Sequence, residues 1–532
     1  MGKIVGEFIN RFDGGIVTDP RNKDTRYSRM VKNFDIHTYP YKMIPFKGSE
    51  SGDANASTRT KRNFLIAPLG TSISTPVLYA MGRQSATDKA EVQYKNLTTG
   101  ASNDLDDSSW ADPTNNQSSG TVSAQSYAVF VYYARTNLIY MVATGKIMGF
   151  DVRTGGSQGV WDDDILTTDS AGFALSYTNI AQGLVHSKDD ILYLPYDNKI
   201  LKNNNKTWTQ ASVTLPTHLK ITSICEDGNY IAIACAPLTG YGKSVVYLWD
   251  RDASLTTLSE SIDWGEGSLF ILEEIDGYLV GISNVGTNSA TTGPTFNQRI
   301  VFRYYVGGKA KIFKEIVSEE STAQLSVQIP KQKQNNYLYF FLAMTFPNGA
   351  LHEGLWKLGR TEDGLWSLSL DRTPNNDTAT TSGTLLGFIK VGDFVFIGYT
   401  DGGVHAISKT IEIAGTSEYT ATTSIYESVI LNDKDSSIKK KLRGVTVFTE
   451  PLPTAGQVVL KYQIDENIDT TTFVTVFTNT TDDSLSYSAV NIESTGVELP
   501  EYKEILFRIE STGGAIITGL KYKSEVIDKD IY

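Results

Sequence analysis

Residues 224–234 read ICEDGNYIAIA, an apolar strand that reaches a polar turn and continues as a second apolar strand. The phrase returns as LEEIDGYLVGI at residues 272–282 and as FIKVGDFVFIG at residues 388–398. Asp-Gly and Gly-Asp pairs supply the positive backbone angles that a tight turn needs. We therefore interpret each phrase as a β-hairpin, whose apolar runs fit strands buried between neighbouring sheets.

Looser copies of the phrase occur at residues 137–141, 189–194 and 335–341. The turns of the series lie roughly 40 to 60 residues apart, about the length of one β-propeller blade. A four-stranded blade cannot bury both faces alone, so the blades must stack. The series predicts six blades, or seven if residues 64–82 form a full blade and not only a closing strand. A row of β-sandwiches with coincidental spacing is the alternative.

The remaining regions differ from the repeats. With 532 residues, 40% of them hydrophobic, the chain is long enough for two or three domains. Helical periodicity is hard to find, so the composition indicates an all-β protein. We predict an extended N-terminal arm at 1–50 that wraps a partner or the propeller rim, the propeller at 51–415, and a C-terminal β-sandwich at 416–532, where short alternating strands follow one another.

Charge and cysteine content limit the function classes. A net charge of −12 disfavours non-specific attraction to nucleic acid or to an anionic membrane surface. No apolar run approaches the length of a membrane span, and the first residues lack an apolar signal core, so we expect a soluble product without a membrane-spanning segment. Cys225 and Cys235 fall on the two strands of one predicted hairpin, and free core residues are favoured there over a disulfide.

Motifs of catalysis or phosphate binding are incomplete. Residues 155–159 read GGSQG, but no helical pattern follows, as a nucleophile elbow requires. Residues 242–244 read GKS without the earlier glycine of a phosphate-binding loop. The string TEDGLW at residues 361–366 is the nearest approach to a sialidase turn, and it has the wrong length. We therefore predict no catalytic residues and no enzymatic activity.

Metal and cofactor sites are not predicted either. The two acidic groups that could offer oxygen ligands match no calcium loop, and we interpret them as solvated loops; they are Asp104, Asp106 and Asp107, and Asp162, Asp163, Asp164 and Asp169. The histidines show no metal spacing; they are His37, His186, His218, His352 and His405. A basic cluster at residues 439–443 lacks interleaved aromatics, so it indicates a charged strand edge or a contact to an acidic neighbour subunit.

The arm carries a family resemblance. Residues 12–21 read FDGGIVTDPR, followed by NFD at 33–35 and PFKG at 45–48. This order resembles the opening of the tail hub and tail nozzle proteins of short-tailed bacteriophages, the group of tail tubular protein B. The last phrase departs from the family pattern, because residues 42–45 read KMIP where a basic residue usually adjoins the proline.

The C-terminal region is similar to the same group. Tyr426-Glu427-Ser428 is followed by a polar link and by a lysine-rich strand start at residues 439–443. The resemblance implies a virion tail protein, assembled in the host cytoplasm as a homo-oligomeric ring, expected to be hexameric. Its partners would be neighbouring tail and adaptor or portal proteins, with tail fibres as further candidates. Such a ring forms part of the DNA exit channel and takes part in genome retention and ejection.

A negative balance suits that role, because a channel must let a polyanion pass without trapping it. The alternative from another class is a carbohydrate-binding or glycan-cleaving propeller, such as a tail adhesin, whose acids would converge from different blades. A third is an intracellular propeller scaffold.

Overall fold

The computed structural model contains two compact units. The propeller unit comprises Glu50–Lys333 and Thr380–Thr410, and the sandwich unit comprises Met1–Ser49, Gln334–Ala379 and Ile411–Tyr532. The structure describes residues 3–17, 21, 24–51, 59–69, 72–84, 87–98, 104–105, 110–113, 116–121, 129–143, 146–152, 160–166, 182–237, 242–252, 258–289, 292–317, 331–345, 351–374, 384–392, 394–401, 404–410, 423–433, 435–468, 470, 472–490 and 499–527.

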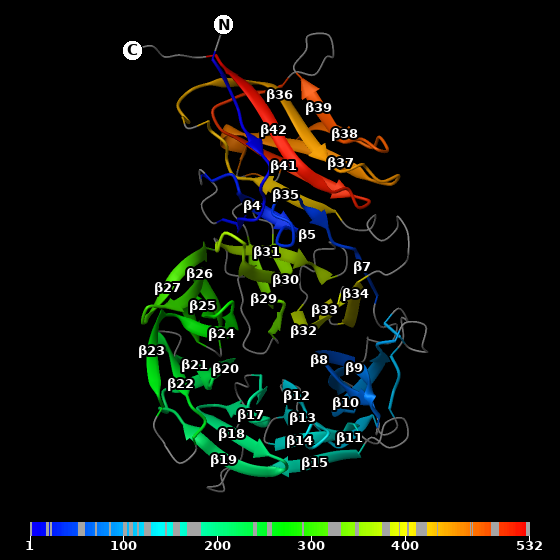
Figure 1. Cartoon of the computed structure of the whole chain (residues 1–532), viewed down its shortest axis with the longest axis vertical. Coiled ribbons are helices and arrows are strands. Elements are labelled where there is room, and N and C mark those ends of the chain that lie inside the picture. The colour runs from blue at the N-terminus through cyan, green and yellow to red at the C-terminus, as the bar shows by residue number, and fades with distance from the viewer. Residues whose placement is uncertain are drawn as a thin grey trace. The chain divides into compact units, whose positions relative to one another are not determined.

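Strands dominate both units. Within the described residues, seven antiparallel groups of four strands follow one another along the chain, and we number them as blades of the predicted propeller, whose fold they confirm (Figure 1). Six of the groups belong to the propeller unit, whereas β29 to β31 of the sixth group belong to the sandwich unit. Blade 1 contains β8 (Arg59–Leu69), β9 (Ser72–Gln84), β10 (Lys89–Asn96) and β11 (Gln117–Thr121), and blade 2 contains β12 (Val129–Tyr133), β13 (Leu138–Ala143), β14 (Lys146–Asp151) and β15 (Val160–Leu166). Blade 3 contains β16 (Leu184–His186), β17 (Ile191–Tyr196), β18 (Lys199–Asn204) and β19 (Thr207–Thr214). Blade 4 contains β20 (Leu219–Asp227), β21 (Tyr230–Pro237), β22 (Lys243–Trp249) and β23 (Glu260–Glu266).

The last blade is completed from the N-terminal side of the chain. Its fourth strand, β7, precedes blade 1 in the sequence. Blade 5 contains β24 (Ser268–Ile275), β25 (Tyr278–Ser289), β26 (Thr292–Val306) and β27 (Lys309–Val317). Blade 6 contains β28 (Gln332–Gln334), β29 (Tyr337–Thr345), β30 (Leu351–Arg360) and β31 (Trp366–Arg372). Blade 7 contains β32 (Thr384–Val391), β33 (Phe394–Asp401), β34 (Val404–Thr410) and β7 (Ser49–Ser51).

The repeated phrase forms the hairpin between the first two strands of blades 2 to 7. Each of these turns contains a residue with positive φ, the backbone angle that the turn chemistry predicted. These residues are Asn137 (55°), Asp190 (51°), Gly228 (61°), Gly277 (79°), Asn336 (61°) and Gly392 (58°). The stretch 64–82, left open by the sequence, lies in the first hairpin of blade 1, which carries no such phrase.

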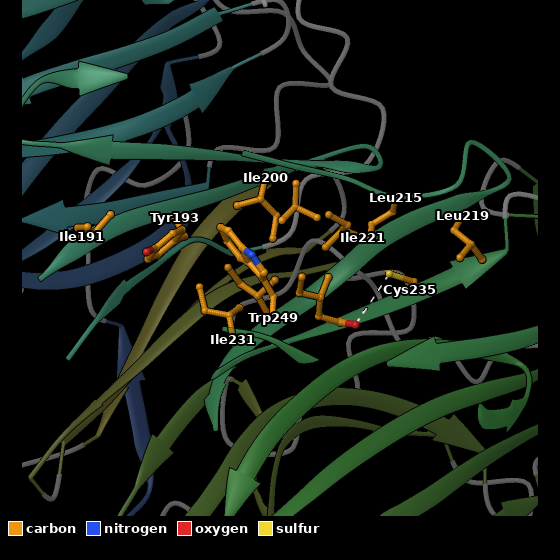
Figure 2. Close-up of a cluster of buried hydrophobic side chains, with 12 residues drawn as sticks. Ile191, Tyr193, Ile200, Leu215, Leu219, Ile221, Ile231, Cys235 and Trp249 are labelled. Carbon is orange, nitrogen blue, oxygen red and sulfur yellow. Dashed lines mark hydrogen bonds between the residues drawn. The ribbon is translucent and has the colours of Figure 1, made fainter. Parts of the chain in front are cut away.

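Apolar side chains fill the space between neighbouring blades of the propeller unit. Tyr193 of blade 3 and Trp249 of blade 4 meet edge to face, with ring centroids 5.6 Å apart (Figure 2). Both belong to a cluster of buried side chains from β17 to β22. Similar clusters join blades 1 and 2, 2 and 3, and 4 and 5, and another joins blade 7 to blade 1. Stacking of blades therefore buries both faces, as the repeats predicted.

Both cysteines are free and buried, as predicted. Cys225 packs in the cluster between blades 4 and 5, whereas Cys235 packs between blades 3 and 4. The two thiols therefore lie on opposite faces of the same sheet, which precludes a disulfide. Burial raises the pKa of each thiol, so neither is a reactive thiolate at neutral pH.

The sandwich unit holds two main sheets, which confirms the predicted C-terminal sandwich. The first contains β1 (Ile4–Val5), β2 (Phe8–Ile9), β42 (Ile517–Val526), β36 (Lys440–Thr449), β39 (Ser486–Val490) and β40 (Glu501–Tyr502). The second runs in the order β28-β29-β30-β31-β4-β35-β41-β37-β38, with β4 (Tyr27–Lys32), β35 (Ser424–Ser428), β41 (Ile505–Thr512), β37 (Gln457–Ile464) and β38 (Val474–Asn479), and with β3 (Gly15–Ile16) on β4.

A short ribbon, β5 (Phe34–Asp35) with β6 (Ile44–Pro45), and a 3-10 turn at Asp465–Asn467 complete the described elements of the sandwich unit. The arm is thus part of this unit: β4 pairs in parallel with β31 and antiparallel with β35. Among the described residues, no helix is long and apolar enough to cross a membrane.

One buried amine in blade 5 leads to a prediction on pH. Lys314 in β27 is 9% exposed, its Nζ has no hydrogen-bond partner in the described part of the chain, and burial lowers its pKa to about 7. The unfolded chain keeps this proton up to about pH 10.5, so the stability of the wild-type protein rises with pH between these two values. Lys314→Met should stabilise the protein by about 1–4 kcal/mol at neutral pH.

This gain is expected to be complete below the folded-state pKa and to shrink as the pH rises toward 10. Thermal unfolding of both proteins between about pH 6 and pH 10 measures it. Lys311→Met, at an exposed position of the same strand, is the matched control. A difference in unfolding midpoint that does not change with pH would contradict the assignment.

Candidate functional site

The first strands of consecutive blades border a cavity of about 450 Å³ in the propeller unit. Figure 1 shows β20 and β24 on the inner side of this unit, with β19 and β23 on its rim. We call this space the inner cavity. Its charged lining consists of three acids and two lysines, Glu226, Glu273, Glu274, Lys331 and Lys333, and its backbone lining includes Gly183 and Gly228.

Lys331 ties two inner strands together. Its Nζ lies 2.8 Å from Glu273 Oε2 and donates to the carbonyl oxygen of Ile224, at 3.0 Å, and to that of Leu272. The side chain is 10% exposed and Glu273 is 15% exposed, so this is a largely buried ion pair. A lysine with three oxygen partners is held in one position, which fixes the spacing of β20 and β24.

The other acids of the inner cavity differ in their partners. Lys333 forms an ion pair with Glu274, which neutralises both side chains. Glu226 has no lysine or arginine partner among the described residues; it accepts a hydrogen bond from the backbone N–H of Ser187. Glu226 is 35% exposed, so a carboxylate without a cationic partner borders the cavity.

A buried histidine lies next to Glu226 and accepts hydrogen bonds from the segment around it. His186 is fully buried, and its Nδ1 lies 3.4 Å from Glu226 Oε1 and 3.2 Å from an Arg251 nitrogen. Arg251 donates a hydrogen bond to Asp189 at 2.5 Å, and the Tyr193 hydroxyl donates one to the same carboxylate at 3.0 Å. The end of β16 and the turn after it are therefore fixed by charged hydrogen bonds, which positions the N–H that Glu226 accepts.

The electrostatics at this end of blade 4 are negative. Burial, and after it the charge of Glu274, raise the pKa of Asp227 above its ordinary value. Glu274 therefore acts on Asp227 as a negative charge, and Glu226 and Asp227 are consecutive acids at the end of β20. The local field therefore favours a positively charged or hydrogen-donating group.

No site residues were predicted from the sequence, although these glutamates lie within the hairpin phrases. Glu226 pairs with Ile231 and Glu274 pairs with Leu279, in each case one step before the last pair of the hairpin. Lys390 holds the same step in blade 7. Alignment of the phrases on their turns would have shown that acids recur at one level of the inner strands.

The motifs considered from sequence have structural roles where they are described. In the GKS string, Lys243 forms an exposed ion pair with Asp263, and the Ser244 hydroxyl donates to Gly267 O at 2.6 Å. In the TEDGLW string, the Gly364 carbonyl accepts from Arg360 in a hairpin turn. The GGSQG string and the side chains of His352 and His405 lie outside the described residues.

Metal ligation receives no support in the described part of the chain, where no three His, Cys, Asp or Glu side chains are placed to share an ion. Of the two acidic groups, Asp104 is buried and its carbonyl accepts from Lys95 at 3.1 Å. The others lie outside the description, wholly or by their side chains; they are Asp106, Asp107, Asp162, Asp163, Asp164 and Asp169.

The basic cluster at the start of β36 is not a strand edge, and that interpretation is wrong. β36 pairs with β42 on one side and with β39 and β40 on the other. Lys439 pairs with Glu501 at 2.7 Å, Arg443 with Glu525 at 2.7 Å, and the buried Lys440 donates to three backbone carbonyls. The cluster is thus stabilised by acids and carbonyls of its own unit.

No protein-family model and no curated protein matches the chain. Solved structures match it at low identity. An exo-β-1,3-galactanase from Phanerochaete chrysosporium is 8% identical, with 90% of this chain and 99% of the galactanase covered and a TM-score of 0.31. Trypanosoma rangeli sialidase is 10% identical, with coverages of 91% and 95% and a TM-score of 0.30. The Dos1 propeller is 11% identical, with coverages of 69% and 95% and a TM-score of 0.34.

The prediction that the chain is not an enzyme is corrected by these matches, because they include a galactanase, a sialidase and a GH43 protein from Bacillus licheniformis. Their likeness to this chain is one of fold, and it transfers neither a substrate nor a catalytic residue. Any enzymatic activity has to be argued from the residues of the inner cavity itself.

Proposed function

We propose that the chain is a carbohydrate-binding propeller whose ligand occupies the inner cavity. One observation carries the proposal: three glutamates and two lysines from neighbouring inner strands converge on one cavity of about 450 Å³. That volume lies in the range of small-ligand sites. Carboxylates accept and ammonium groups donate hydrogen bonds, which matches the paired donor and acceptor character of sugar hydroxyls.

Titration of the full chain with a panel of neutral, amine-bearing and acid-bearing oligosaccharides tests this proposal. We expect at least one member to bind, and the double variant Glu226→Gln/Lys333→Gln to bind it about tenfold more weakly, because two hydrogen bonds with charged groups are lost. Glu466→Gln changes an exposed acid of the sandwich unit and is the control. A panel without any binder, or a double variant that binds like the wild type, would sink the proposal.

Glycan cleavage is the finer form of the proposal, and the same reagents test it. Glycoside hydrolysis uses two carboxyl groups that flank the scissile bond. Glu226 and Glu274 stand at the same level of adjacent inner strands, so they are the pair to change. Release of reducing ends by the wild-type chain, abolished by either Glu→Gln change, would establish cleavage. Binding without release would limit the function to recognition.

A second candidate function is that of a structural subunit of a bacteriophage tail, as the arm resemblance implies. The supporting observation concerns Gly15, in the phrase that carries the resemblance. Gly15 has φ 71°, and a Cβ there would lie 2.6 Å from the backbone nitrogen of Leu368. Phe12 and Ile16 of the phrase, and Phe34 after it, are buried. The close contact with Leu368 therefore requires a glycine at position 15, and the buried side chains of the phrase pack the arm within the sandwich unit.

On this candidate the chain forms a ring, expected to be hexameric, beside adaptor or portal proteins, and double-stranded DNA passes through it. The net charge of −12 would limit adhesion of the DNA. Peptide mass spectrometry across a density gradient of lysate tests it. Co-migration with DNA-filled particles at a low fixed copy number would support the tail role. Recovery only from the fractions without particles would overturn it, and a glycan-binding chain that co-migrates would be a tail adhesin.

A further inference from the structure

The charged side chains of the inner cavity are not equivalent, and their pairing narrows the ligand class. This step rests on the proposed carbohydrate function. Lys331 is committed to Glu273 and to two backbone carbonyls, so it cannot turn toward a ligand without breaking three interactions. Glu273 is neutralised by the same contact. This pair therefore supplies structure and contributes little net charge to the cavity.

The second lysine is also paired. Lys333 and Glu274 are 34% and 25% exposed, so a ligand can touch both, but together they present a dipole and not a net charge. With both lysines assigned to acids, Glu226 is the lining carboxylate without a lysine or arginine partner in the described chain. Its hydrogen bond from Ser187 N fixes one oxygen and supplies no formal positive charge to the carboxylate.

The surroundings of Glu226 keep that carboxylate in place. The backbone at Ser187 follows the buried His186, and Arg251 with Asp189 hold this segment through bonds at 3.2 and 2.5 Å. The turn after β20 has Gly228 at φ 61°, and a Cβ added to this glycine would meet no atom of the described residues within 4 Å, so these residues leave the mouth of the cavity beside Glu226 open. A ligand group can therefore approach the carboxylate without displacing a side chain there.

We infer that the inner cavity selects a saccharide with a free ammonium group, a glucosamine-type residue, and that Glu226 receives this ammonium. A carboxylate that is partly withdrawn from water and has no cationic partner gains most from a ligand that brings the missing charge. A neutral N-acetylated sugar of the same size would leave that charge uncompensated. Specificity then arises from the ion pair between Glu226 and the ligand ammonium group, and the lysine–glutamate pairs of the cavity add hydrogen bonds to the sugar hydroxyls.

The test compares two ligands that differ only at the nitrogen. Isothermal titration of the full chain with a chitosan tetramer and with the N-acetylated chitin tetramer, at a pH where the free amine is protonated, measures the preference. We expect the chitosan tetramer to bind at least tenfold more tightly, as one charged hydrogen bond predicts. Glu226→Gln should reduce the ratio to about twofold or less.

Two controls separate site binding from general attraction of a polycation to an acidic protein. Glu466→Gln removes one exposed acid far along the chain, and its ratio should equal that of the wild type. Thermal unfolding confirms that Glu226→Gln is folded. Equal affinity for the two tetramers, or a preference that survives Glu226→Gln, overturns the inference while the carbohydrate function stands. If neither tetramer binds and another member of the panel does, the inference is again wrong; if nothing in the panel binds, the proposed function itself fails.

Discussion

Val31→Asp is expected to unfold the sandwich unit. Val31 is fully buried at the centre of β4, where it pairs with Tyr426 of β35. Five of the six residues of β4 are buried, so both faces of this strand are covered and a new carboxylate finds no water. Burying an unpaired charge costs several kcal/mol, comparable with the whole stability of an ordinary domain. We expect a loss of about 4 kcal/mol or more.

Hydrogen exchange of the β35 and β41 amides measures this loss, since both strands belong to the sheet that contains β4. The matched control is Ile4→Asp, the same type of change at an arm residue that is 59% exposed; its effect should stay within about 0.5 kcal/mol. Wild-type protection in Val31→Asp would show that β4 is not a central strand. The arm would then be free to wrap a partner, as the sequence alone indicated.

Turn chemistry explains which parts of the fold could be predicted from sequence. The phrases of blades 2 to 7 have Gly, Asn or Asp at positive φ, a local requirement that the sequence displays directly. Blade 1 escaped the series because the sequence between its first two strands, LGTS at residues 69–72, contains no Asp-Gly or Gly-Asp pair. The fourth strand of blade 7 could not be predicted, since β7 and β34 pair although the strands of blades 1 to 6 lie between them in the sequence.

The inner cavity was only partly visible in the sequence. Glu226 and Glu274 recur at one position of the phrase, so a comparison of hairpins registered on their turns finds them. The roles of Lys331 and His186 depend on contacts between different blades. Local patterns do not encode such contacts, because loops of variable length separate the blades. For the same reason the sequence could not tell the free carboxylate from the neutralised ones.

Trp249→Ala should give the largest loss of stability within the propeller unit. Trp249 is fully buried between blades 3 and 4 and meets Tyr193 edge to face at 87° (Figure 2). Its removal leaves a cavity that the surrounding strands cannot close, and such truncations cost about 3–5 kcal/mol. The thermal unfolding midpoint should fall by roughly 5–15 °C. Trp249→Phe keeps an aromatic ring at the position and is the control.

The control also tests how the blades are held together. The indole N–H of Trp249 is buried and has no hydrogen-bond partner among the described residues, so phenylalanine loses volume but no hydrogen bond. We expect Trp249→Phe to cost less than half as much as Trp249→Ala. Ile224 and Ile231 belong to the same cluster, and the hairpin that joins them carries Glu226. If blade packing positions the inner cavity, Trp249→Ala should therefore weaken oligosaccharide binding at temperatures where the protein is still folded. Unchanged affinity would show instead that the contacts of Lys331 and His186 are sufficient to hold the cavity in place.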